Sequence, residues 1–465
     1  MQRMAPVGAR VNILAGGSLV GGALTVLALL LLWVLRAEGI WVALLLFPIL
    51  IIATAPALMR QAERERDRNL FWLLLAALVL KLLGALVRYF VSFKIYRGAV
   101  DAVAYHEIAT ALAERFRAGN FDTGLDTLTS TNFISFFTGL VYTAIGTSVH
   151  AGFLLYSWLA FWGLFYLYRA FTIAVPGGSH RTYARLLFFL PSILYWPSSI
   201  GKEAWMLFAL GLTAFGVARS LTGQTLRGLT TAGVGLWLAA LVRPHVAGMA
   251  ALGLAVAYTV GRTQRGRRPA GSAMKFLGAA ALVALAVVLL SQTARFLEEQ
   301  GLDPEEGVTA VLDQTTERTT RGDSSFAVPS AGFSPARLPW ATVTILFRPF
   351  LFEAHNVQAG ITALESTILL GLAISRARPI GRAVRSFRRL PYITFVVVYA
   401  GLFVLAFSSI ANFGILARER TQLLPFFLVL LAVPGVRAGR ASPTSSAATA
   451  SLPARRADDH QLARA

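Results

Sequence analysis

Asp101 and Tyr105 stand four positions apart, a spacing that puts two side chains on one face of a helix. If that helix lies where water meets lipid, its carboxylate can accept a proton from a hydroxyl group, which is the work of a general base. Tyr105 and the adjacent His106 would then orient the hydroxyl. The alternative interpretation is that Asp101 only caps the helix that follows it.

A second polar stretch, residues 195–203, contains Pro197 and Gly201 followed by the pair Lys202 and Glu203. Proline and glycine open the backbone between two apolar runs. A lysine beside the free amides at the start of the next helix can bind phosphate. The alternative interpretation is a structural turn with a tryptophan at the membrane interface and an ion pair at the surface.

Arginines dominate the other polar positions between apolar runs. A guanidinium group binds phosphate through two parallel hydrogen bonds and keeps its charge when partly desolvated. A set of arginines therefore predicts an anionic partner such as a lipid phosphate or pyrophosphate. The alternative is that each arginine extends to ordinary lipid head groups. This set, with the ionisable residues beside it, is Arg243, His245, Arg348, Glu353, His355, Arg418 and Arg420.

Metal and nucleotide chemistry have little basis in the sequence. His106, His150, His245 and His355 are far apart, so no metal site is predicted. A divalent cation stays a possible cofactor, because Glu353 and His355 could bind one together with ligands from distant parts of the chain. The chain has no cysteine, which excludes a disulfide or a thiolate site. No Walker, Rossmann or Gly-x-Ser-x-Gly motif stands in the right context, which argues against a soluble nucleotide donor.

The composition indicates an all-α integral membrane protein. Of 465 residues, 56% are hydrophobic and only 14% are charged, which is too little polar surface to cover a soluble globule of this size. The net charge of +20 would suggest nucleic acid in a soluble domain. Here the arginines occupy short loops between apolar runs of bilayer-spanning length, so topology and anionic lipid account for most of the excess. No nucleic-acid partner is expected.

The apolar runs predict about twelve transmembrane helices within a single polytopic domain, residues 1–436. Arg-rich loops alternate along the chain and are cytoplasmic by the positive-inside rule. The first run is long and uncleaved, so both termini are predicted in the cytoplasm of a plasma-membrane protein. The predicted spans are residues 15–35, 40–57, 70–93, 152–168, 183–196, 204–218, 226–242, 246–260, 274–290, 357–374, 392–410 and 423–436. The Arg-rich loops are residues 60–68, 169–185, 262–268, 376–389 and the disordered tail 437–465.

Two large loops then face outward. Residues 94–150 contain segments typical of helices that lie at the interface, at 101–116 and 133–145. If residues 133–145 crossed the bilayer, every later Arg-rich loop would fall outside. Residues 291–339 are charged and contain glycine and serine, which indicates a mobile segment and a candidate lid. All the polar stretches above fall on the outward side, which predicts an active site at the outer face.

Together these features resemble the GT-C class of membrane glycosyltransferases. The resemblance rests on Asp101 just after an early span, the interfacial helix behind it, the many further spans, and a last span beginning Ala-Arg-Glu-Arg-Thr-Gln-Leu-Leu-Pro at residues 417–425. The stretch Pro-Ser-Ser-Ile-Gly-Lys-Glu at residues 197–203 and the Arg-rich end are also similar to bacterial exopolysaccharide polymerases. Many GT-C members have an acidic pair or a soluble outward domain, and neither is evident here.

The resemblance implies transfer of a sugar from a polyprenyl-phosphate-linked donor to a glycan or glycolipid acceptor of the cell envelope. Asp101 matches the catalytic acidic residue of the class and would deprotonate the acceptor hydroxyl. Stabilising the charge on the departing lipid phosphate is usually the largest catalytic term. The predicted phosphate ligands are Lys202, Arg243, Arg348, Arg418 and Arg420.

Three alternatives remain open at this point. A polysaccharide polymerase of envelope or exopolysaccharide assembly would share the chemistry. A transporter or flippase for a lipid-linked or anionic solute would need polar residues at mid-membrane depth, where only Lys81, Arg88 and Glu365 come close. A scaffold of an envelope assembly complex would leave Asp101 dispensable.

Overall fold

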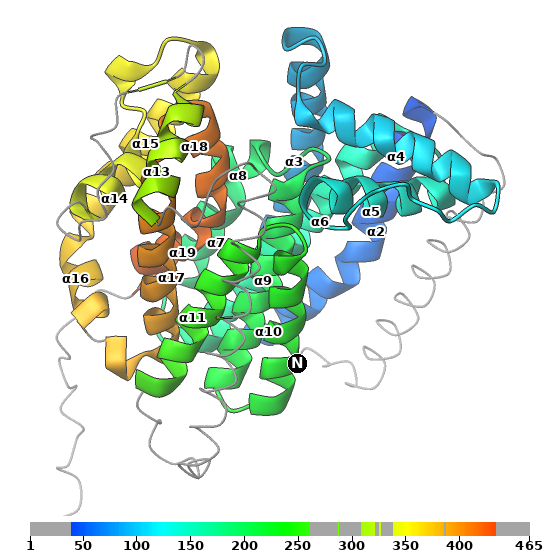
Figure 1. The fold of residues 1–465 in the computed structure, drawn as a ribbon. Helices are drawn as coiled ribbons and strands as arrows, with labels where there is room; N and C mark the ends of the chain where they lie inside the picture. The colour runs from blue at the N-terminus through cyan, green and yellow to red at the C-terminus, as the bar shows by residue number, and fades with distance from the viewer. Residues whose placement is uncertain are drawn as a thin grey trace, which may run out of the picture.

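The computed structural model describes residues 39–260, 287, 308–320, 325–326, 338–385 and 387–433, and these form helices joined by short connections (Figure 1). Five helical stretches are long and apolar enough to cross a membrane. The chain is therefore a helical protein with several potential membrane spans. The five stretches are α2 (Ile40–Glu65), α3 (Arg68–Phe90) with its π-helical extension η1 (Val91–Ile95), α6 (Val149–Ala174), α9 (Lys202–Leu221) and α15 (Val357–Ser375).

The other predicted spans are short, broken or outside the described residues, so the count of twelve is not confirmed. Short helices occupy three of them: α10 (Thr225–Ala240), α11 (Pro244–Val260) and α17 (Pro391–Phe407). The last predicted span is α19 (Leu424–Ala432), whose 9 residues reach only about 14 Å. The predictions at 15–35 and 437–465, and that at 274–290 except residue 287, lie outside the described residues.

The predicted span at 183–196 is wrong as a continuous helix. It divides into α7 (His180–Phe189) and α8 (Pro191–Tyr195), with Leu190 between them in an extended conformation. The reason is local, because the ring of Pro191 disfavours the helical conformation of the residue before it. Past the break, the carbonyl groups of Ile193 and Leu194 in α8 accept hydrogen bonds from the amine of Lys81 on α3.

Helices α6 and α9 form the centre of the bundle. In the most apolar stretches of α6 and α9, 72% and 78% of the residues are buried. The same share for α15 is only 28%, and its side chains Ile361, Leu364 and Ile368 face outward. A Cβ atom on Gly211 of α9 would lie 2.2 Å from the carbonyl oxygen of Gly163 on α6. Only glycine permits this approach of the two backbones, and such contacts between small residues are typical of helix packing in membranes.

The two segments expected at the interface are the helices α4 (Asp101–Arg117) and α5 (Ser130–Ile145), which pack against each other. Figure 1 shows α4 lying across the direction of α9 and α10. Ala102, Tyr105, Ala109 and Phe116 form the buried face of α4 at the spacing of helical turns, while Glu107 is exposed. The apolar face of α4 therefore holds it on the bundle.

Arg-rich loops that were predicted to share a side of the membrane meet at one end of the bundle. Asp67, between α2 and α3, forms an ion pair of 2.8 Å with Arg181 at the start of α7. Arg376, after α15, donates to the carbonyl oxygen of Val433 at 2.5 Å. The amide of Ser179 donates to the carbonyl of Ala432 at 3.0 Å, which joins these two pairs of segments to each other.

Part of the candidate lid is a helix, α13 (Val308–Thr319), which docks on the segment before α18 (Phe413–Glu419). The hydroxyl of Thr316 donates to the carbonyl of Ser409 at 3.0 Å, and Ala411 donates its amide to the hydroxyl of Thr319 at 2.9 Å. The helix α14 (Leu338–Phe347) and the 3₁₀ turn η3 (Leu351–Glu353) follow. Helix α16 (Ala377–Arg385) and the turns η4 (Phe387–Arg389) and η5 (Arg420–Gln422) complete the described elements.

Candidate functional site

Five charged residues from four parts of the chain form a continuous set of ion pairs, here called the charged network. They are Asp101, Glu203, Arg243, Arg418 and Glu419. The first opens α4, the second lies in the first turn of α9, the third precedes α11, and the last two end α18. The sequence predicted four of them as site residues, and the structure brings those four together.

Arg418 links the outer and inner parts of the charged network. Its Nη1 donates to Oδ2 of Asp101 at 2.8 Å, and its Nε lies 2.8 Å from Oε1 of Glu203, an ion pair without hydrogen-bond geometry. Arg243 donates from Nη2 to Oε1 of Glu419 at 2.7 Å and to Oε1 of Glu203 at 3.3 Å. One guanidinium therefore holds the exposed carboxylate while the other holds the two buried ones.

Exposure falls steeply along the charged network. The side chain of Asp101 is 59% exposed and that of Arg418 is 31% exposed. Arg243, Glu203 and Glu419 are only 8–9% exposed. Charges that deep are stable only when paired and hydrogen-bonded. Arg243 therefore neutralises two interior carboxylates, and a phosphate that bound it directly would have to displace one of them. Its role as a phosphate ligand stays a prediction.

Lys202, the first residue of α9, provides an accessible cation beside the charged network. Its amine donates to the hydroxyl of Ser130, the first residue of α5, at 2.9 Å, and forms no ion pair within the described part of the chain. The charged groups of Arg243, Glu203, Arg418 and Glu419 all lie close enough to act on it. An incoming anion could bind Lys202 without first displacing a carboxylate.

Tyr105 and His106 point to different neighbours. Tyr105 is buried, and burial, followed by the charges of Glu203 and Asp101, raises its pKa to about 12, so its hydroxyl stays protonated beside the charged network. His106 has Nδ1 2.9 Å from the hydroxyl of Tyr142 on α5. Burial lowers the pKa of His106, which favours the neutral ring. Tyr105 therefore lies beside Glu203 and Asp101, whereas His106 faces Tyr142 on α5.

Arg348 is already engaged by groups of the protein. Its Nε lies 3.0 and 3.1 Å from the two carboxylate oxygens of Glu353. Its guanidinium carbon lies 4.3 Å from the ring centre of Phe326 and 5.0 Å from that of Phe413. Burial acts to raise the pKa of Glu353, but the hydrogen bonds it accepts lower it overall, so the pair stays charged. His355 is exposed nearby.

Arg420 is fully buried and joins three segments of the bundle. Its Nη1 donates to the carbonyl of Arg348 and to the hydroxyl of Ser366, both at 3.0 Å, and its Nη2 lies 3.4 Å from Oε1 of Glu365. The same carboxylate accepts the amide of Ser192 in α8 at 2.6 Å. A phosphate that bound Arg420 would have to replace these interior contacts, so its role as a phosphate ligand stays a prediction.

His245 lies on α11 with its ring centre 5.9 Å from that of Phe407 on α17, away from the exposed end of the charged network. Over the residues that the structure describes, no three histidine, aspartate or glutamate side chains gather as a metal site would require. Glu419 was not identified from the sequence as a site residue. Its position between two arginines at the start of an apolar run was the signal, since ionisable residues at such places are usually paired and functional.

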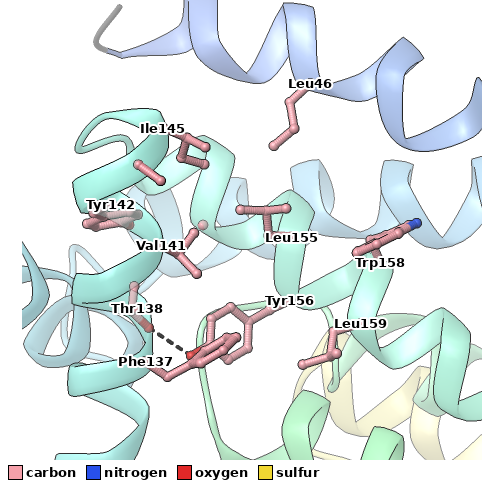
Figure 2. Close-up of a pocket in the computed structure, with 12 residues that line it drawn as sticks. Leu46, Phe137, Thr138, Val141, Tyr142, Ile145, Leu155, Tyr156, Trp158 and Leu159 are labelled. Carbon is pink, nitrogen blue, oxygen red and sulfur yellow. Dashed lines mark hydrogen bonds between the residues drawn. The ribbon is translucent and has the colours of Figure 1, made fainter. Parts of the chain in front are cut away.

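An apolar cavity of about 280 Å³ lies between α2, α5 and α6 (Figure 2). Leu46, Phe137 and Leu155 are among the residues that line it. Two of its polar groups satisfy each other, because the hydroxyls of Thr138 and Tyr156 are 2.7 Å apart. The cavity therefore suits hydrocarbon, and sequence periodicity offered no means of locating it.

Comparison of the chain with family models, with curated proteins and with solved structures gives no match, so its function has to be argued from these residues.

Proposed function

We propose that the protein is a membrane glycosyltransferase that moves a sugar from a polyprenyl-phosphate-linked donor to a cell-envelope glycan or glycolipid at the outer face of the plasma membrane. The observation that carries the proposal is the exposed pair of Asp101 and Arg418 at the open end of an otherwise buried charged network. This pair offers a proton acceptor and an anion-binding group within 2.8 Å of each other.

In the proposed reaction the acceptor oxygen forms a bond to the anomeric carbon of the sugar while the bond from that carbon to the phosphate oxygen breaks. The acceptor proton passes to Asp101. The departing lipid phosphate gains negative charge, which Lys202 and Arg418 neutralise. A phosphate that binds Arg418 draws the guanidinium away from Asp101 and leaves that carboxylate free to act as the base.

The buried residues of the charged network have a positioning role in this scheme. Glu203 holds Arg418 through its Nε, and Arg243 in turn holds Glu203 and Glu419. Gln422 donates to the other oxygen of Glu419 at 2.8 Å. These contacts hold Arg418 rigidly in place, as is required of a group that stabilises the charge developing in the transition state.

The surroundings of Lys202 support a lipid-linked donor. Its partner Ser130 begins α5, and farther along α5 Phe137 lines the apolar cavity of Figure 2. The ring of Phe137 also packs 4.9 Å, centre to centre, from that of Trp205 in the first turn of α9. Packed aromatic side chains thus connect the cavity to the first turn of α9, which carries Lys202. A polymerase that uses lipid-linked glycans as donor and acceptor would employ the same groups.

A carrier for a lipid-linked or anionic solute is the second candidate, and Lys81 is the observation that favours it. Its amine is fully buried in α3 and donates to the carbonyl of Ile193 at 2.6 Å, in the short helix α8. A buried cation facing an interrupted helix is a feature of transporter sites.

Transfer of labelled sugar from polyprenyl-phosphate donors in proteoliposomes tests the proposal. We expect Asp101→Asn to keep the fold and donor affinity while kcat falls on the order of a hundredfold. Asp122→Asn, which changes an exposed carboxylate in the same loop, serves as the matched control and should transfer normally. Full transfer by Asp101→Asn would exclude Asp101 as the general base and favour the alternative that it caps α4. Solute uptake by the wild type without any transfer would favour the carrier.

A further inference from the structure

A cavity of about 120 Å³ lies between the loop after α3, the start of α15 and α18. It combines aromatic rings with side-chain amides. Three rings line it, those of Tyr96, Trp196 and Phe413, together with the amides of Asn356 and Gln358. Its size fits one small ring and is well below that of pockets for drug-sized ligands, which begin at about 300 Å³.

The side-chain oxygens of both amides accept hydrogen bonds from the protein, which leaves their nitrogens available to donate to a ligand. The hydroxyl of Tyr96 donates to Oε1 of Gln358 at 2.6 Å. Oδ1 of Asn356 caps α15 by accepting the amide of Ala359 at 2.8 Å. Neither amide nitrogen has a partner in the described segments of the chain. Each can therefore donate two hydrogen bonds to a ligand oxygen.

Two of the three rings are held by contacts with other side chains. The guanidinium of Arg88 lies 4.9 Å from the ring centre of Trp196, and the ring of Phe413 stacks on that of Phe326 at 4.3 Å. Rigid aromatic faces bind apolar C–H surfaces, whereas amide donors bind hydroxyl oxygens. A ligand that offers both kinds of surface on one small ring is a sugar.

The cavity adjoins the charged network through two connections. Tyr96 belongs to the loop that leads into Asp101, and Ala417, which also lines the cavity, directly precedes Arg418. A ring bound here would therefore lie against the two segments that carry the proposed base and the proposed phosphate ligand.

We propose that this cavity is a binding site for a single sugar residue of the substrates, held by stacking on Trp196 and by hydrogen bonds from Asn356 and Gln358. The inference rests on the proposed function, because it names the subsite where one substrate sugar binds. The ring comes either from the donor or from the end of the acceptor, and kinetics distinguish these two sources.

Two substitutions remove one kind of contact each. Trp196→Leu removes the aromatic face, and Trp196→Phe retains part of it. Asn356→Asp keeps the oxygen that caps α15 but loses the amide donors. The matched controls are Trp237→Leu, at a tryptophan that is 61% exposed on α10, and Asn120→Asp in an exposed loop. Size-exclusion profiles and melting temperatures identify any variant that fails to fold, in which case Trp196→Phe and Asn356→Asp carry the test.

The first readout is the transfer assay with donor and acceptor titrated separately. We expect Trp196→Leu and Asn356→Asp to raise KM for one of the two substrates about tenfold, the equivalent of one stacking or hydrogen-bonding contact, with a smaller change in kcat. Trp196→Phe should recover part of the loss. The substrate whose KM rises identifies the source of the sugar. Unchanged KM values for both substrates, with transfer intact, would overturn the cavity assignment and leave the transferase standing.

The second readout is independent of activity. Saturation-transfer-difference NMR with methyl β-D-glucopyranoside, methyl β-D-galactopyranoside and methyl α-D-mannopyranoside measures binding to the full chain in detergent. We expect a signal from at least one glycoside that weakens in Trp196→Leu and persists in Trp237→Leu. Such a signal without any transfer would keep the sugar site and reject the transferase. Equal signals in both variants, or none in the wild type, would reject the site.

Discussion

Replacing Arg243 with methionine would leave two carboxylates, Glu203 and Glu419, without their shared cation inside the protein. Both side chains are 9% exposed, so water cannot take the place of the guanidinium. Removing one partner of a buried ion pair typically costs about 3–5 kcal/mol. We therefore expect Arg243→Met to lower the free energy of unfolding by about that amount, less whatever is recovered when one carboxylate takes up a proton.

Thermal or denaturant unfolding of the purified protein in detergent measures this cost. The double variant Arg243→Met, Glu419→Gln removes a charge from each side of the pair and should regain part of the lost stability, which a double-mutant cycle quantifies. Arg227→Met is the matched control, because Arg227 is exposed on α10 and has no carboxylate partner among the described residues. It should unfold as the wild type does.

The opposite pattern would refute the reasoning. If Arg243→Met unfolded like the wild type while its affinity for a polyprenyl-phosphate donor fell, the guanidinium would be a direct phosphate ligand. The sequence-based assignment of Arg243 as a phosphate ligand would then be supported, and a role limited to neutralising Glu203 and Glu419 would be wrong.

Three further predictions use other parts of the fold. In this cysteine-free chain, Asp122→Cys should react with an impermeant maleimide from outside intact cells and Asn69→Cys should not; the reverse labelling would invert the proposed topology. Gly211→Leu should unfold the bundle or prevent its insertion, because even a Cβ atom there lies 2.2 Å from the carbonyl of Gly163, and a normal melting curve would contradict that packing. The lowered pKa of Glu353 means that its stabilising ion pair is present above the ordinary carboxyl value near 4.5 and is lost as pH falls through the lowered value. The melting temperature of Glu353→Gln should therefore depend less on acid than that of the wild type.

The sequence alone predicted that these site residues lie on the same side of the membrane, because the number of spans between their loops determines the side. Asp101, Lys202, Arg243 and Arg418 each follow or precede an apolar run, and the alternation of Arg-rich loops assigns all four to one side. The structure joins three of them through Glu203 and places Lys202 beside them. Periodicity cannot give the pairing itself, since which carboxylate meets which guanidinium depends on how distant helices pack.

Hydropathy was less informative about helix length and exposure. Residues 424–432 are as apolar as a membrane span, yet α19 is buried by its neighbours and ends after nine residues. An apolar run reports only that water is excluded, and lipid and protein exclude it equally well. The break at Pro191 was visible in the sequence as a proline inside an apolar run, which marks a probable end of a helix.

The distinction between Arg418 and Arg420 shows what only the structure could supply. Both are arginines in one short segment, but one is 31% exposed and the other fully buried. With Lys202, the charged network has three cations and three carboxylates, so it is balanced before any substrate binds. In the proposed reaction the lipid phosphate leaves with one more negative charge than it carried as a diester. Asp101 loses one negative charge when it accepts the acceptor proton. The charge of the site therefore stays constant through transfer, and this links the base and the phosphate ligands into one unit.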